Sequence, residues 1–326
     1  MVKIGIIGAG HMGKTHALSL KKDERVEIIG VADIMERRAQ ALAMEVGGQA
    51  YTSADALLGV APDAVYVCTP NTLHTELVLQ ALKRGIHVFS EKPMATSLRE
   101  ARQILQTAES SKGIYQVGHN RRFAPVYKFA RRLIEEGFHP YSANVKMNRG
   151  ELINPQWVCN RAITGGFLYE STIHLLDMIR WLMGEVVEVQ CKGQQNICAE
   201  LDDFAMVLTF ASGHFAAFSS SAHTSWAFPF ERIELYGGHA SIVTEEMERV
   251  IYSPGLAQEI IVRDYFQLDI AEKWGYLEED RLFVEAILKG QAPAVTATDG
   301  YKAVELVEAC YQSAALNGVP VTLPLR

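Results

Sequence analysis

Short hydrophobic runs alternate with amphipathic stretches through the first 120 residues of the chain. Five of these runs have the length and β-branched content of buried strands, at 3–7, 26–32, 64–68, 86–89 and 114–117. The stretches between them predict helices, and Ser97 followed by Glu100 is a capping box that opens one of these helices. Strands that alternate with helices predict a doubly wound parallel α/β sheet, which binds its ligands at the carboxyl ends of the strands.

The pattern changes after about residue 122, where apolar and polar residues alternate with a period of two. Two pairs of such runs flank Ser-Gly or Gly-Gly turns and predict hairpins, at 204–210 with 215–218 and at 233–236 with 240–244. Two helices are expected near the end of the chain, at about 271–289 and 301–316. We therefore predict two domains, a doubly wound α/β domain over 1–122 and an α+β domain with a mostly antiparallel sheet over 123–326.

The composition is that of a soluble globular protein, with 326 residues of which 48% are hydrophobic and 21% charged. A formal net charge of -7 without a long Lys/Arg run argues against nucleic acid as a partner. No run approaches the length of a membrane span, and the first one is a short strand and not a signal peptide. Five scattered cysteines with no CxxC pair predict free thiols and no zinc site. We expect a cytoplasmic protein with no membrane partner.

A glycine-rich turn, Gly8-Ala9-Gly10-His11-Met12-Gly13, follows the first predicted strand. Gly8 allows a tight turn, Gly10 lets the backbone approach a pyrophosphate, and Gly13 lets the next helix pack on the sheet. The N-terminus of that helix offers unpaired N–H groups to phosphates. Asp33, twenty residues past Gly13, follows the second apolar run, where a carboxylate can bind ribose hydroxyls. The turn and Asp33 together predict a Rossmann dinucleotide site.

The acid also bears on which dinucleotide is bound. Asp33 favours NAD, because a carboxylate repels the 2′-phosphate of NADP. Arg37 and Arg38 are close enough in sequence to meet that phosphate, so NADP stays open.

Polar residues after the strand at 64–68 are candidates for contact with the nicotinamide ribose. They are Thr69, Pro70, Asn71 and His74. His74 can equally be an ordinary helix residue.

Glu91-Lys92-Pro93 comes just past the strand that ends at Phe89, at the sheet edge where the reactive end of a dinucleotide lies. Pro93 cannot continue a strand ladder and fixes a turn, in which a cis bond before the proline is an option. A lysine held there can donate a hydrogen bond to a substrate oxygen. Glu91 and Lys92 are also candidates for contact with the cofactor. The alternative is a surface lysine in a loop, which is where most lysines lie.

A second group of candidates follows Gly165-Gly166, which marks a helix start, with the helix running to about Met183. Glu170, His174 and Asp177 are spaced i, i+4 and i+7, so all three are expected on one face. An imidazole between two carboxylates can move a proton near neutral pH. The alternatives are a buried histidine satisfied by its neighbours and a metal site, although the spacing is not of the HExxH type.

Other polar residues are candidates for contact with a substrate. Asn120 and Arg122, where the two predicted domains meet, can reach substrate oxygens or form an interdomain hydrogen bond or salt bridge. Trp157 and Asn160 belong to an aromatic and polar group that suits a carbohydrate, although each alone is more often a surface residue.

Together, GAGHMG, Asp33, TPNTLH, EKP, GHNRRF and GGFLYESTIHLLDM resemble the Gfo/Idh/MocA oxidoreductase family, which includes glucose–fructose oxidoreductase and inositol dehydrogenases. The resemblance implies an N-terminal Rossmann domain for NAD or NADP and a C-terminal domain whose open sheet carries substrate and oligomer contacts. It places the family's catalytic lysine on Lys92 and its acid/base histidine on His174. Asp177 matches the family's acid three residues later, as a structural or substrate-binding residue. The chain departs from the family at Glu170, where Asp is common, so substrate reach can differ.

The activity implied is hydride transfer between a nicotinamide cofactor and a secondary alcohol or ketone of a cyclitol, sugar or sugar derivative. Lys92 and His174 would be the proton-transfer pair, with Glu170 as a further catalytic residue, in a homodimer or homotetramer. Two other functions stay open: cleavage of glycosides with transient use of NAD, and a non-catalytic dinucleotide sensor. A sensor needs no proton shuttle, so the retained Lys92 and His174 disfavour it, whereas the fold alone cannot exclude it.

Overall fold

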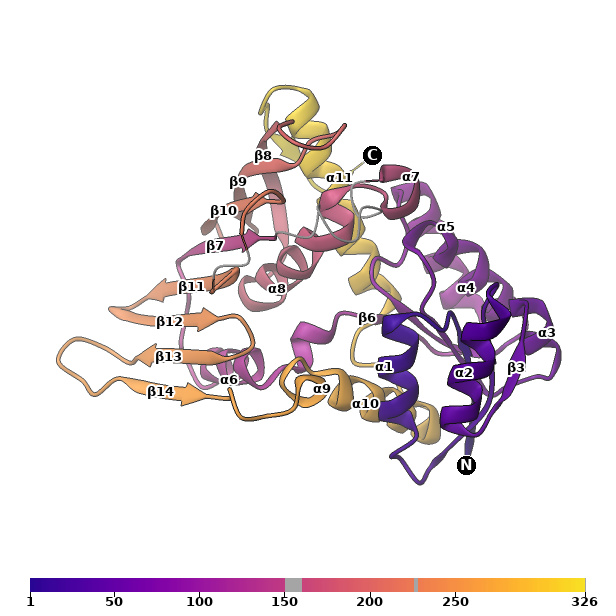
Figure 1. Cartoon of the computed structure of the whole chain (residues 1–326). Helices are drawn as coiled ribbons and strands as arrows, with labels where there is room; N and C mark the ends of the chain where they lie inside the picture. The colour runs from indigo at the N-terminus through magenta and orange to yellow at the C-terminus, as the bar shows by residue number, and fades with distance from the viewer. Residues whose placement is uncertain (150–159, 226–227, 326) are drawn as a thin grey trace. The chain divides into compact units, whose positions relative to one another are not determined.

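The chain forms two compact units in the computed structural model, which describes residues 1–149, 160–225 and 228–325 (Figure 1). The first unit comprises Met1–Asn120 and Gly275–Tyr301, and the second comprises Arg121–Trp274 and Lys302–Arg326. The sequence pattern predicted two continuous domains, so the return of residues 275–301 to the first unit is a difference from expectation.

The first unit is built on a six-stranded parallel sheet with the strand order β3-β2-β1-β4-β5-β6. Its strands are β1 Val2–Ile7, β2 Val26–Ala32, β3 Gln49–Tyr51, β4 Ala64–Val67, β5 His87–Glu91 and β6 Tyr115–Gly118. From β1 the sheet is extended on one side by β2 and β3 and on the other by β4, β5 and β6. The boundary between β1 and β4 is the topological switch point, where a Rossmann sheet binds its dinucleotide. The predicted doubly wound parallel sheet is confirmed.

Helices separate the strands of the first unit, as the sequence pattern predicts. They are α1 His11–Leu20, α2 Glu36–Val46, α3 Ala54–Gly59, the 3-10 turn η1 Asn71–Leu73, α4 His74–Lys83 and α5 Leu98–Ser110. The Ser97 hydroxyl accepts the N–H of Glu100 at 3.3 Å, which confirms the N-cap of α5.

The helix expected over 271–289 is instead two helices, α9 Ile270–Lys273 and α10 Tyr276–Lys289. Gly275 between them has a φ of +88°, a left-handed conformation that interrupts the helix. Phe283 and Val284 of α10 are fully buried in the same apolar cluster as Ile4 of β1. This burial explains why α10 joins the first unit, since exposing such side chains costs about 1.5–3 kcal/mol each.

The second unit contains a nine-stranded sheet with the order β14-β13-β12-β11-β7-β10-β9-β8-β15. Its strands are β7 Ser142–Asn148, β8 Val186–Gln194, β9 Asp203–Phe210, β10 Phe215–Ser221, β11 Glu231–Gly237, β12 Ala240–Glu245, β13 Arg249–Ser253, β14 Ile261–Asp264 and β15 Val321–Thr322. Only β7 and β10 pair in parallel among these neighbours. The mostly antiparallel sheet and both predicted hairpins are confirmed.

Helices pack on this sheet, with α6 Pro125–Glu135 against β12 and β13 and α8 Ile173–Met183 against β7. The other helical segments are α7 Arg161–Thr164, the π-helical η4 Leu168–Thr172 and α11 Ala297–Ala315, the last of which begins in the first unit. Along β9, Phe204, Met206 and Leu208 are buried, whereas Ala205 and Val207 between them are exposed. One face of the sheet therefore packs on helices and the other is open, as the period-two pattern requires.

The cysteines differ in part from expectation. Cys68, Cys191 and Cys310 are free thiols, but Cys198 is in a disulfide, so the expectation of free thiols is wrong at this position. Spacing along the chain does not show which thiols a fold brings together.

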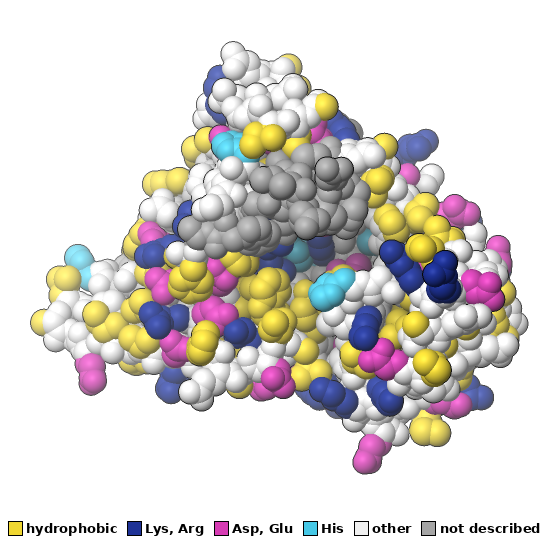
Figure 2. All heavy atoms as spheres, viewed as in Figure 1, with side chains coloured by type: hydrophobic (Ala, Val, Ile, Leu, Met, Phe, Trp, Pro, Cys, Tyr) yellow, Lys and Arg dark blue, Asp and Glu magenta, His cyan; other side chains and the backbone are white. Residues whose placement is uncertain are grey.

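No helix in the described part of the chain is long and apolar enough to cross a membrane. Charged side chains of both signs are interspersed over the face shown in Figure 2.

Candidate active site

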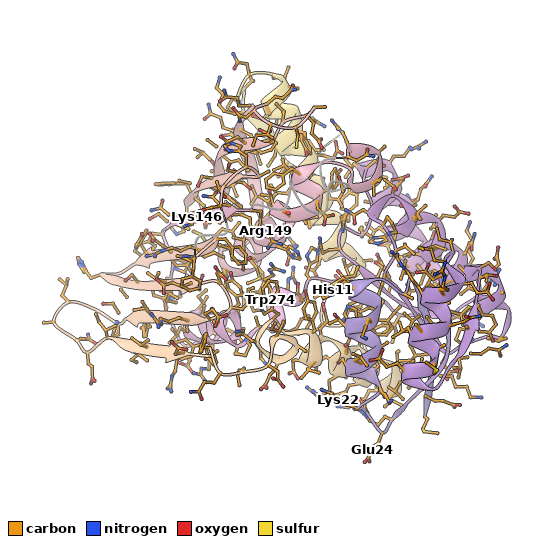
Figure 3. All side chains as sticks on the ribbon, viewed as in Figure 1. His11, Lys22, Glu24, Lys146, Arg149 and Trp274 are labelled. Atoms are coloured by element: carbon orange, nitrogen blue, oxygen red, sulfur yellow. The ribbon has the colours of Figure 1, made fainter. Side chains whose placement is uncertain are left out.

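The glycine turn between β1 and α1 has the shape that a bound dinucleotide needs. Gly8 has a φ of +98°, and a Cβ placed there would lie 2.5 Å from the Cys68 carbonyl oxygen. A Cβ at Gly13 would lie 1.8 Å from the Gly8 carbonyl oxygen, so only glycine fits either position. A Cβ at Gly10 would meet nothing within 4 Å, which leaves open space above that backbone. The turn thus fits a pyrophosphate over Gly10, and His11 begins the helix behind it (Figure 3).

Asp33 lies directly beside this turn. One carboxylate oxygen accepts the N–H of Ala9 at 2.8 Å, and the other accepts the N–H of Met35 at 2.8 Å. Each oxygen keeps a second lone pair, so the carboxylate can hold the turn and accept a ribose hydroxyl at the same time. His11 is exposed and Met12 is half-buried, and contact of these two residues with the dinucleotide stays a prediction.

Asp33→Asn is expected to weaken the preference for NAD. The amide oxygen can still accept one backbone N–H, but the charge that repels a 2′-phosphate is gone. We expect the ratio of the Kd for NADPH to the Kd for NADH to fall about tenfold or more, roughly 1.4 kcal/mol. Fluorescence titration of both cofactors measures this, with Asp55→Asn as a control on an exposed acid of the same unit. An unchanged ratio would assign cofactor choice to other residues.

His74 at the start of α4 joins two loops at the carboxyl edge of the sheet. Its Nδ1 lies 2.8 Å from the Pro93 carbonyl oxygen, and its Nε2 lies 2.8 Å from that of Thr69. The ring is fully buried, and this burial lowers its pKa despite the two carbonyl contacts. These contacts favour the structural alternative for His74, whereas contact of Thr69, Pro70 and Asn71 with the cofactor stays a prediction.

Lys92 follows the last residue of β5, and the Lys92–Pro93 peptide bond is cis, as the sequence allowed. The Glu91 carboxylate accepts the backbone N–H of Lys92 at 3.1 Å with one oxygen. Its other oxygen lies 3.1 Å from Nε2 of His16. Burial opposes the charge of Glu91, but His16 and Lys92 outweigh it and lower the pKa of Glu91. Glu91 is therefore an anion that shapes the turn carrying Lys92.

The single helix expected after Gly166 is divided into a π-helical segment, η4, and a regular α-helix, α8. Glu170 lies in the π-helical η4, and His174 and Asp177 lie in the regular helix α8. A π-helical turn contains more residues than an α-helical one, so i, i+4 spacing does not set Glu170 and His174 in the usual register. His174 and Asp177 are both buried and lie three residues apart on α8.

A buried chain of polar groups lies behind His174. Nη1 of Arg121 lies 3.3 Å from Nε2 of His174, and Nη2 donates to the Glu231 carboxylate at 3.0 Å. Tyr127 donates to the other oxygen of Glu231 at 3.0 Å, and Trp274 stacks on the guanidinium with its ring centroid 5.1 Å away. A guanidinium can only donate, so Nε2 of His174 is the acceptor and Nδ1 carries the proton. Sequence reasoning missed Arg121 and Glu231, because their partner residues lie 53 and 110 positions away.

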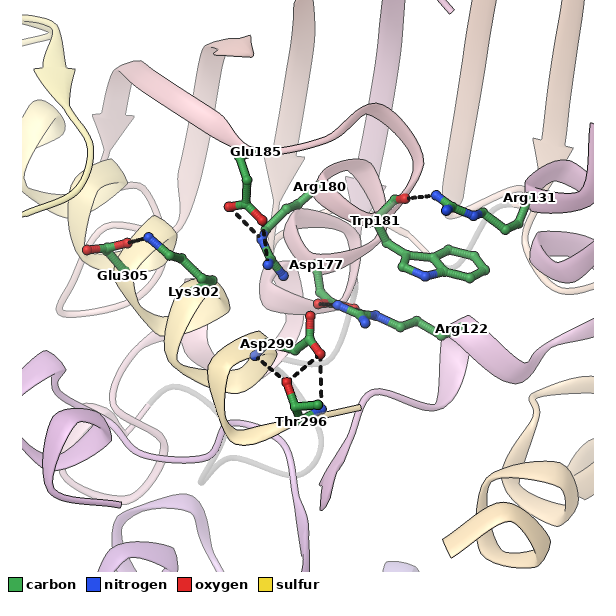
Figure 4. Close-up of polar contacts among 10 residues, drawn as sticks. All are labelled: Arg122, Arg131, Asp177, Arg180, Trp181, Glu185, Thr296, Asp299, Lys302 and Glu305. Carbon is green, nitrogen blue, oxygen red and sulfur yellow. Dashed lines mark hydrogen bonds and ion pairs between the residues drawn. The ribbon is translucent and has the colours of Figure 1, made fainter. Parts of the chain in front are cut away.

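Arg122 and Asp177 form a buried bidentate ion pair, with N–O distances of 2.8 and 2.6 Å (Figure 4). Arg122 thus forms the salt bridge that was its alternative role, within the second unit, although contact of Arg122 or Asp177 with substrate stays a prediction.

Asn160 is exposed and caps α7 through the N–H of Ala162 at 3.0 Å. Trp157 lies outside the described residues. Among the described residues, no group of three or more His, Cys, Asp and Glu side chains could hold a metal ion.

Comparison with known proteins identifies the family to which both halves of the chain belong. Residues 2–119 match the family model described as "Oxidoreductase family, NAD-binding Rossmann fold", and residues 131–323 match its "C-terminal alpha/beta domain". The chain belongs to the Gfo/Idh/MocA oxidoreductase family. It is an NAD-binding oxidoreductase whose first unit is the Rossmann domain.

Relatives and a solved structure match over nearly the whole length. The chain is 29% identical to inositol 2-dehydrogenase of Rhizobium meliloti, over 96% of this chain and 97% of that protein. It is 28% identical to myo-inositol 2-dehydrogenase of Thermotoga maritima, over 96% of each. The crystal structure of GenD2 from gentamicin A biosynthesis, in complex with NAD, matches with a TM-score of 0.86 and 25% identity, over 99% of this chain and 97% of that one.

Proposed function

We propose that this oxidoreductase transfers a hydride between NAD and a secondary alcohol or ketone of a cyclitol or sugar, with Lys92 and His174 as the proton-transfer pair. The observation that carries the proposal is the Lys92 turn, in which a buried carboxylate shapes the backbone of a lysine at the carboxyl end of β5. The names of the full-length relatives support a cyclitol as the first substrate to test.

Each side chain has a separate task in the proposed reaction. Bound NAD would supply the acceptor for the hydride. The Lys92 ammonium donates a hydrogen bond to the reacting oxygen and stabilises the charge that develops there. His174 takes the hydroxyl proton during oxidation and returns it during reduction. Its Nε2 lies 3.3 Å from Nη1 of Arg121, which is long for a hydrogen bond, so a closer hydroxyl can compete for this atom.

A panel of polyols and sugars tests the proposal. The protein with NAD is offered inositols first and then aldoses and their derivatives, and NADH formation is followed by absorbance. We expect turnover with at least one cyclitol or sugar and slower turnover with NADP. The absence of NADH formation with every polyol, together with no oxidation of NADH by keto-sugars, would contradict the proposed function.

A further inference from the structure

His16 on α1 is a fully buried histidine that the proposed chemistry does not use. Its Nδ1 lies 2.7 Å from an oxygen of Asp280 on α10, and its Nε2 lies 3.1 Å from an oxygen of Glu91. Asp280 is almost fully buried, and both partners are carboxylates. A neutral imidazole has only one N–H, so donation to both carboxylates requires the imidazolium form.

The imidazolium connects three parts of the first unit. His16 belongs to α1, the helix that begins at the glycine turn, and it contacts Glu91, which precedes the Lys92–Pro93 bond. It also contacts Asp280 on α10, a helix that lies late in the sequence. The other oxygen of Glu91, Oε2, accepts the N–H of Lys92. A chain of hydrogen bonds therefore runs from Asp280 through His16 and Glu91 to the backbone of Lys92. Loss of the His16 proton removes one of the two donors and releases Glu91 or Asp280.

We propose that His16, held as an imidazolium between Asp280 and Glu91, is the positioning residue of the Lys92 turn. The inference deepens the proposed function, because its consequence for catalysis rests on the role of Lys92. His16 acts through Glu91, and it ties the order of the turn to its own protonation.

The surroundings of His16 determine how pH acts on the turn. The ring faces Asp280 and Tyr276 from α10, Glu91 and Phe89 from β5, and Tyr66 from β4. Burial opposes its charge, but Asp280 and Glu91 outweigh burial and raise the pKa of His16 well above its ordinary value. The stabilising effect of the imidazolium is therefore complete below the pKa of an unfolded histidine and is lost as the pH rises through the folded-state pKa.

Hydrogen exchange of the whole protein tests the proposal without a known substrate. Backbone exchange over residues 90–95 is measured by mass spectrometry from neutral to alkaline pH, corrected for intrinsic rates. In His16→Gln we expect exchange of this segment to be about tenfold faster at neutral pH, while peptides of β1 and α5 keep wild-type rates. In Asp280→Asn the wild-type alkaline rise should occur about one pH unit lower, because one of the two neighbouring anions is gone.

His87→Gln is the matched control, since His87 starts the same strand and its ring accepts the N–H of Ile114 at 2.9 Å without touching Glu91. This variant should leave the alkaline rise over residues 90–95 unmoved. Wild-type exchange in both His16→Gln and Asp280→Asn, or faster exchange spread evenly over the first unit, would overturn the proposal. Lys92→Met separates the two ideas: if it retains turnover, the proposed function fails, whereas the exchange result stands by itself.

Discussion

Lys92→Met is expected to lower kcat by about 10²–10⁴-fold, the usual contribution of a positioned proton donor or acceptor. Methionine keeps most of the length of the side chain but cannot donate to the reacting oxygen. The backbone N–H of residue 92 still bonds to Glu91, so the turn is preserved. His174→Asn should reduce kcat by a similar factor, because an amide cannot accept the hydroxyl proton. Steady-state kinetics on the best substrate of the panel measures both.

Cofactor binding separates a chemical role from a structural one. The Kd for NADH, measured by fluorescence, should stay within about threefold of wild type in both variants, a change below ~1 kcal/mol. Lys83→Met, on an exposed lysine at the end of α4, is the control for loss of a positive charge. Wild-type turnover in Lys92→Met or His174→Asn would remove that residue from the proposed pair.

Glu231→Gln is expected to lower the free energy of unfolding by about 3–5 kcal/mol, the cost of leaving a buried charge without its counter-charge. Glu231 is fully buried, and its ion pair with Arg121 at 3.0 Å is also buried. The glutamine oxygen can still accept the hydroxyl of Tyr127, so the change isolates the loss of charge. Urea unfolding followed by circular dichroism gives the free energy.

Two further variants make this measurement specific. Glu185→Gln breaks an ion pair with Arg180 in which Glu185 is about half exposed, and it should cost less than ~1 kcal/mol. Arg121→Met combined with Glu231→Gln removes both charges and should recover part of the stability lost in the single variant. If the double variant were less stable than Glu231→Gln alone, charge burial would not be the source of the loss.

Local patterns were enough to predict much of the fold. The apolar runs identified every strand of the first unit except the short β3 at its edge, and period-two alternation identified the two hairpins of the second unit. The turn could be read from the spacing of its glycines, and the steric requirement at Gly13 is local, since a Cβ there would meet the Gly8 carbonyl oxygen. At Gly8 the clash is with the carbonyl of Cys68 after β4, so that requirement comes from the tertiary structure. The continuous domain boundary failed for residues 275–301, because the apolar face of α10 does not show which sheet it will cover.

The sequence by itself thus determined the alternation of strands and helices in the first unit, the hairpins of the second, the dinucleotide turn and the candidate residues Lys92 and His174. Only the tertiary structure decided what surrounds them. His16 pairs with carboxylates 75 and 264 residues away, and Arg121 pairs with Glu231 at a separation of 110. Side chains project from a helix or a strand with a fixed period, so the face that each element buries leaves a periodic pattern in the sequence. Buried charges must find opposite charges wherever the fold brings them, and such pairs leave no spacing to read.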